Sequence, residues 1–169
     1  MKPKAQWPDG PWKHEPDEKR WEDRNTGLEC LALRGPVGSW CGYVGVREGH
    51  PAYGFSSYKT DFDLVEIASG RAAKQVNVQH QVNEISVHGG LTYAGTDDAR
   101  GKHLHWYGFD CSHAGDYSPS YEAIEQLGQS TGWGCVVEYR DLAYVMAECG
   151  RLAEQLGAIN PNKKPERTD

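Results

Sequence analysis

The densest group of reactive side chains in the sequence lies in the segment HLHWYGFDCSHAGD, residues 103–116. The segment contains histidine, aspartate and cysteine side chains, namely His103, His105, His113, Asp110, Asp116 and Cys111. If residues 103–109 form a strand, alternate side chains share a face, so His103, His105 and Tyr107 should point the same way. Imidazoles and carboxylates in the turn that follows could bind Zn²⁺ or Mn²⁺, or move protons.

The same side chains also have ordinary structural interpretations. Aspartates cap turns, Cys111 could be a small core residue, and a histidine can simply bond a backbone carbonyl. The spacing matches no standard ligand motif, so we assign no metal and keep a divalent ion only for a catalytic alternative. A nucleophilic pair of Cys111 and His113 is a further interpretation, but no oxyanion-hole motif accompanies it.

A second motif, HGGLTY, begins at His88. The paired glycines Gly89 and Gly90 let the backbone turn sharply or approach a ligand closely, and their N–H groups could hold a phosphate. His88 and Thr92 would add polar contacts. A β-bulge or tight bend would use the same glycine pair, so both interpretations stay open.

Net charge and hydropathy exclude several classes of partner. The formal net charge of −6 disfavours binding along a DNA or RNA polymer, which needs several cations against successive phosphates. No apolar run approaches the roughly 20 residues that cross a bilayer, and the first residues show no secretory pattern. Five cysteines without a CxxC pair predict reduced thiols. We therefore expect a cytoplasmic protein with neither a membrane nor a nucleic-acid polymer as partner.

Short β-branched and aromatic runs bounded by Gly and Pro predict strands in four places. They are GLECLALRG, WCGYVGV, NEISVHGGLTYAG and HLHWYGFDC. From Tyr139, apolar residues recur at helical spacing, whereas Arg140, Glu148, Arg151 and Glu154 fall elsewhere on the helical wheel. SYEAIEQLG, from Ser120 to Gly128, predicts a shorter helix, and DLVEIASGRAAKQVN is left open.

These elements predict an α+β fold: a largely antiparallel sheet covered by a C-terminal amphipathic helix. We expect an irregular N-terminal arm at 1–26, a single α+β domain at 27–159 and a flexible tail at 160–169. The length suits one domain.

Four blocks in a fixed order carry a resemblance: GSWCGYVGVREGHPAYG, HGGLTYAG, WYGFDCSHAGD and YRDLAYVMAECGRLAEQL. Together they resemble a family of uncharacterised proteins from tailed phages, prophages and their bacterial hosts, over most of residues 27–156. The family supplies no established catalytic residues. In its pattern other residues usually stand at HLH, which weakens a multi-histidine metal site built on His103 and His105.

The resemblance implies a phage protein in a bacterial host cell, for which counter-defence is a plausible role. The preferred hypothesis is therefore sequestration of a small nucleotide-derived immune signal, in a possible homo-oligomer. The expected ligand-binding residues combine phosphate contacts with aromatic stacking, namely His88, Gly89, Gly90, Thr92, Tyr93, Trp106, Asp110 and His113. An alternative is a hydrolase or phosphodiesterase that uses His88, Asp110, His113 and Asp116. A third is an accessory protein that binds a host protein.

Overall fold

A five-stranded antiparallel sheet forms the centre of the computed structural model, which describes residues 4–57, 70–101, 103–120 and 137–163. Its strand order is β1-β2-β3-β5-β4, and every neighbouring pair is antiparallel. The strands are β1 (Glu18–Glu22), β2 (Glu29–Arg34), β3 (Trp40–Arg47), β4 (Tyr93–Thr96) and β5 (Leu104–Asp110). The central strands β2, β3 and β5 lie where the sequence predicted strands.

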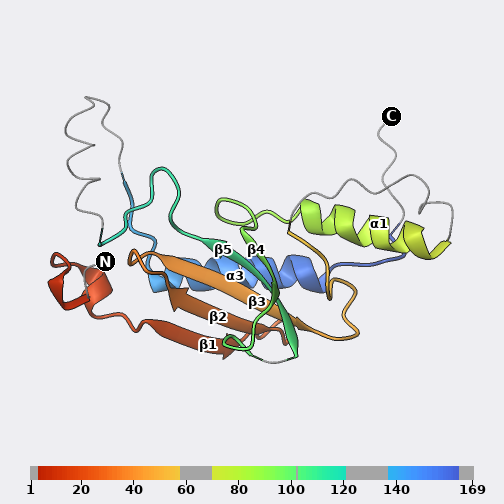
Figure 1. The fold of residues 1–169 in the computed structure, drawn as a ribbon, viewed down its shortest axis with the longest axis horizontal. Coiled ribbons are helices and arrows are strands. Elements are labelled where there is room, and N and C mark those ends of the chain that lie inside the picture. The colour runs from red at the N-terminus through yellow and green to blue at the C-terminus, as the bar shows by residue number, and fades with distance from the viewer. Residues whose placement is uncertain (1–3, 58–69, 102, 121–136, 164–169) are drawn as a thin grey trace.

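The C-terminal helix α3 (Leu142–Gly157) lies along one face of this sheet (Figure 1). Its buried residues include Val145, Cys149, Leu152 and Leu156, and they share a core with side chains of β2, β3 and β5. Asp141 caps the helix by accepting a hydrogen bond from the Tyr144 amide at 2.8 Å. The predicted α+β fold, an antiparallel sheet covered by a C-terminal amphipathic helix, is confirmed.

One residue of α3 departs from the predicted helical wheel. Glu148 was placed away from the apolar face, but only 1% of it is exposed. Its Oε2 accepts a hydrogen bond from the His88 amide at 3.1 Å, and Arg151 pairs with its other oxygen. The His88 amide thus satisfies one oxygen of this buried carboxylate, and the Arg151 guanidinium supplies the opposite charge beside the other.

The segment expected to be an irregular arm contains a strand, which corrects that part of the prediction. Glu18–Glu22 form β1 at the sheet edge, where four of the five residues are exposed. The one apolar residue of β1, Trp21, packs partly buried against the core, and a single apolar position in a charged edge strand gives no alternation for sequence analysis to detect. Before it lie the short 3-10 helices η1 (Lys4–Gln6) and η2 (Pro11–Lys13).

This N-terminal segment is also anchored to the rest of the fold. Trp12 is buried and stacks on Tyr117, with ring centroids 4.9 Å apart. Glu15 accepts hydrogen bonds from the Leu142 amide at 2.9 Å and from the Tyr139 hydroxyl. The arm therefore ties together the segments on either side of residues 121–136.

Helix α1 (Gly70–Asn83) occupies the end of the segment that sequence analysis left open. Val78 and Val82 join the core under α3. The Asn77 side chain donates to the carbonyls of Pro161 and Lys163, so the first residues after Ile159 contact α1. The helix predicted from Ser120 to Gly128 lies outside the described residues beyond Ser120, as do residues 164–169.

The predicted strand NEISVHGGLTYAG is correct only at its end. β4 begins at Tyr93, and residues 85–92 form a turn in which Gly89 and Gly90 have φ of 65° and 85°. Gln155 of α3 bonds both the amide and the carbonyl of Ser86, in place of a neighbouring strand. Among the helices of the described residues, none has the length and apolar character needed to cross a membrane.

Candidate functional site

The turn at residues 85–92 places His88 between a carboxylate and a phenol. Its Nε2 lies 2.7 Å from Oδ2 of Asp116, and its Nδ1 lies 2.9 Å from the Tyr144 hydroxyl. Because a carboxylate can only accept, Nε2 carries the proton in the neutral ring and Nδ1 accepts from Tyr144. Asp116 follows β5, and Tyr144 lies in the first turn of α3. Three segments distant in sequence thus fix one imidazole.

Asp116 is held as a charged carboxylate inside the protein. Only 2% of its side chain is exposed, and it accepts hydrogen bonds from His88, the His113 amide at 3.0 Å and Arg140 at 3.1 Å. Burial by itself raises the pKa of this carboxyl, but the bonds from His88, His113 and Arg140 together lower the pKa below its usual value. Asp116 therefore stays ionised at neutral pH.

His113 lies beside this pair and opens the site to solvent. Its ring centroid is 5.5 Å from that of His88, and 37% of its side chain is exposed. Nδ1 of His113 lies 3.7 Å from Oδ2 of Asp116 and 4.0 Å from Oδ1 of Asp110. The four catalytic candidates of the sequence, His88, Asp110, His113 and Asp116, are thus brought to one place.

Gly89 makes the approach of the two histidines possible. It has a φ of +65°, and a Cβ at this position would lie 2.1 Å from Cε1 of His113. No side chain fits between the backbone and the imidazole. The neighbouring Gly90 has a φ of +85°, and a methyl group added there would meet no described residue other than its chain neighbours within 4 Å. The Gly90 amide donates to the Val87 carbonyl at 2.9 Å. Gly89 is therefore needed for the close contact with His113, and Gly90 for the turn.

Three contributors to the site were missed in the sequence: Tyr144, Arg140 and Glu148. Arg140 donates to Asp116 and to Glu138 at 2.6 Å, and its guanidinium lies 4.9 Å from the Tyr144 ring centroid. Tyr144 and Glu148 are one helical turn apart, so both reach the His88 turn. The i, i+4 spacing of Tyr144 and Glu148 beside the apolar stripe is the sequence feature that could have indicated that both contact the same segment.

Other residues expected to bind ligand lie elsewhere. Trp106 is 1% exposed and packs with Leu31, Tyr43 and Leu104 in a separate hydrophobic cluster, not in the core under α3. Tyr93 meets Tyr43 edge to face, with centroids 5.7 Å apart. The Thr92 amide donates to the Gly108 carbonyl. The structure therefore does not gather these aromatics around His88.

The predicted common face of His103, His105 and Tyr107 is only partly correct. His105 and Tyr107 are neighbours, with ring centroids 5.0 Å apart, and Nε2 of His105 lies 2.9 Å from the Phe55 carbonyl. Burial lowers the pKa of His105 below its usual value, and the hydrogen bond to the Phe55 carbonyl offsets only part of that decrease. His103 precedes β5 with a φ of +74°, so it does not follow the strand alternation.

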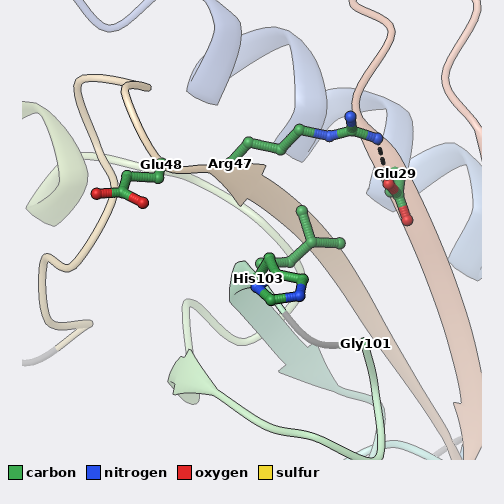
Figure 2. Close-up of a pocket in the computed structure, with 6 residues that line it drawn as sticks. Glu29, Arg47, Glu48, Gly101 and His103 are labelled. Atoms are coloured by element: carbon green, nitrogen blue, oxygen red, sulfur yellow. Dashed lines mark hydrogen bonds and ion pairs between the residues drawn. The ribbon is translucent and has the colours of Figure 1, made fainter.

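His103 instead lines a surface pocket of about 400 Å³ (Figure 2). Arg47 and Glu29 form an ion pair of 2.7 Å at this pocket. Their charges satisfy each other, which leaves the carboxylate of Glu48 as the remaining carboxylate of the lining.

Cys111 is unsuited to be a nucleophile. Only 1% of it is exposed, and its amide donates to the Trp40 carbonyl at 2.8 Å. Burial raises the pKa of its thiol, with a further increase from the nearby Asp116 charge. The thiolate that attacks in cysteine enzymes is therefore disfavoured.

His88, His113 and Asp116 are the group of described residues that could hold a metal ion. Each offers one ligand atom, and these atoms lie within 4.8 Å of one another. Two imidazoles and one carboxylate are also sufficient for proton transfer. No family model, curated protein or solved structure matches the chain, so the resemblance to the phage family stays a prediction.

Proposed function

We propose that the protein is a hydrolase that acts on a phosphate ester at the site formed by His88, His113 and Asp116. The observation that carries this proposal is the double hydrogen bonding of His88, to Asp116 at 2.7 Å and to Tyr144 at 2.9 Å. Both ring nitrogens of His88 are engaged in these bonds, so the partly exposed His113 would take the proton of the attacking water, or the site would hold a metal ion that acidifies the water.

The surroundings of the imidazole support catalysis more than a purely structural role. A histidine that only fixes a turn needs one backbone partner, whereas His88 is oriented by two side chains from separate elements. His113 adds a second imidazole that is 37% exposed, so a substrate can reach the pair. A reactive group that is rigidly held and open on one side is the arrangement that catalysis requires.

A phosphate ester is the proposed substrate because Arg140 and the two imidazoles are groups that bind phosphate oxygens. The sequence interpretation adds that the molecule is nucleotide-derived and that its destruction would serve a phage against its host. That role in counter-defence is part of the proposal and rests on the resemblance alone.

Sequestration without hydrolysis remains the competing proposal. It relies on the amides of both Gly89 and Gly90 to hold phosphate, but the Gly90 amide already donates to the Val87 carbonyl. This contact favours hydrolysis over sequestration as the use of this site.

The test is incubation of the purified protein with cyclic dinucleotides, cyclic oligonucleotides and ADP-ribose derivatives, followed by chromatography of the recovered compound and thermal-shift measurements. We expect breakdown of one class by the wild type and by His80→Ala, whose imidazole is 69% exposed on α1. His88→Ala should abolish breakdown. Stabilisation by an intact compound would instead support sequestration, and no response to any compound would favour a protein partner.

A further inference from the structure

We infer that Nε2 of His88, Nδ1 of His113 and Oδ2 of Asp116 form a binding site for one divalent transition-metal ion. The catalytic role of this ion, activation of water, rests on the proposed hydrolase function. The metal site itself is argued from geometry alone. The three ligand atoms lie within 4.8 Å of one another.

The first argument is the unsatisfied nitrogen of His113. Its Nδ1 is inaccessible to solvent and has no hydrogen-bond partner within the part of the chain that the structure describes. The nearest carboxylate oxygens, on Asp116 and Asp110, are 3.7 and 4.0 Å away, beyond hydrogen-bond length. A buried nitrogen without a partner is costly, and a cation placed between it and Asp116 would remove that cost.

The second argument is the way outer contacts orient the ligands. Tyr144 bonds Nδ1 of His88 and leaves Nε2 toward the site, while Arg140 bonds Oδ1 of Asp116 and leaves Oδ2 toward it. Gly89 allows the His113 ring to lie against the backbone. Metal-ligating histidines and carboxylates almost always have such partners on their second polar atom. Binding of the ion through Nε2 requires the other neutral tautomer, in which the ring proton lies on Nδ1 and is donated to the Tyr144 oxygen, so Tyr144 changes from donor to acceptor.

The third argument is charge. Including the ligand Asp116, carboxylates outnumber guanidinium groups at the site, with Asp110, Asp116, Glu138 and Glu148 against Arg140 and Arg151. This balance attracts a cation, and a bound cation would in turn allow a phosphate ester to approach. A metal-bound water has a strongly lowered pKa and supplies hydroxide at neutral pH.

The donor set selects the kind of ion. Two imidazoles and one carboxylate suit Zn²⁺, Mn²⁺ or Fe²⁺, whereas Mg²⁺ and Ca²⁺ prefer oxygen ligands alone. Ligand atoms of one tetrahedral zinc ion are about 3.4 Å apart. A pair of ligand atoms 4.8 Å apart therefore has to approach by about 1.4 Å, which a rotation of the partly exposed His113 ring would have to provide.

The test measures metal binding rather than activity. Metal-stripped protein is titrated with Zn²⁺ by calorimetry and with Co²⁺ by visible absorption, which reports nitrogen and oxygen ligation directly. We expect one ion per chain in the wild type. His113→Ala and Asp116→Asn should weaken Zn²⁺ binding by more than the roughly 10- to 100-fold that outer contacts contribute. His80→Ala is the matched control for binding by a surface imidazole and should bind as the wild type does.

Thermal unfolding of each metal-free variant separates loss of ligand from loss of fold, and His113→Ala is the decisive variant because its side chain is the most exposed of the three. Equal affinity in the wild type and His113→Ala, or an absence of binding to the wild type, would overturn the inference. If the protein hydrolyses a substrate but binds no ion, the proposed function stands and the metal site is wrong. If an ion binds at these ligands but no substrate is hydrolysed, the metal site stands and the proposed function is wrong.

Discussion

The hydroxyl of Tyr144 lies 2.9 Å from Nδ1 of His88, although 56 positions separate the two residues in the chain. This contact joins the helix that covers the sheet to the turn that carries His88. It also decides the ring orientation, because Nδ1 is occupied and Nε2 must face Asp116. The site is therefore built on the packing of α3, and the predictions below test that construction.

Tyr144→Phe should weaken Zn²⁺ binding about 10- to 100-fold, because His88 loses the partner that orients its ring. The affinity is measured by calorimetric titration of metal-stripped protein. Tyr43→Phe is the matched control, since its hydroxyl accepts from Arg100 at 3.3 Å in the hydrophobic cluster around Trp106. Equal affinities in the two variants would show that the Tyr144 contact does not orient the ligand.

Gly89→Ala and Gly90→Ala should differ although the two glycines are adjacent. Each change places a side chain at positive φ, which costs about 1–2 kcal/mol. Only Gly89→Ala also drives a methyl group to 2.1 Å from the His113 ring. We therefore expect a larger loss in the free energy of unfolding, measured by urea denaturation, and a displaced His113 signal in NMR spectra for Gly89→Ala alone. If Gly90→Ala were equally harmful, the close contact would not be the reason for Gly89.

Glu15→Gln should destabilise the protein by about 1.5–3 kcal/mol at pH 7, because charged hydrogen bonds anchor the arm through this carboxylate. Glu15 accepts from Arg34 at 2.8 Å, Trp40 at 3.1 Å and the Leu142 amide. Burial by itself raises the pKa of Glu15, but these bonds and that from Tyr139 lower it.

The lowered pKa sets the direction of the pH dependence. The unfolded chain binds a proton near the ordinary glutamate pKa of about 4.3, before the folded chain does. The contribution of Glu15 is therefore complete above that pH and is lost as the pH falls toward the lower folded pKa. Urea unfolding at a series of pH values should show a shallower acid decline for Glu15→Gln. Glu18→Gln, on the exposed edge strand, should follow the wild type.

Cys111 should resist iodoacetamide in the folded protein and react after unfolding in urea. Its thiol is buried, and burial raises its pKa, so little thiolate is available. Peptide mapping by mass spectrometry measures labelling at each cysteine, with the more accessible Cys41 as the internal comparison. Rapid labelling of Cys111 in the native protein would restore the cysteine nucleophile as a candidate.

The sequence by itself determined the elements whose signals are local. Strands β2, β3 and β5 show alternating or aromatic runs, and α3 shows an apolar stripe at helical spacing, because each buries a face against the core. The same local reasoning identified His88, Asp110, His113 and Asp116, whose side-chain types and positions in turns suit a site.

Only the tertiary structure determined that residues 18–22 form the edge strand β1 and which side chains contact the candidate site. β1 is charged and gains its hydrogen bonds from β2, so its own residues show no alternation. Tyr144, Arg140 and Glu148 resemble polar residues on the outside of a helix until the His88 turn packs against them. Hydrogen bonds between segments 24 to 60 positions apart depend on how the sheet and α3 pack, and no periodicity within either segment specifies them.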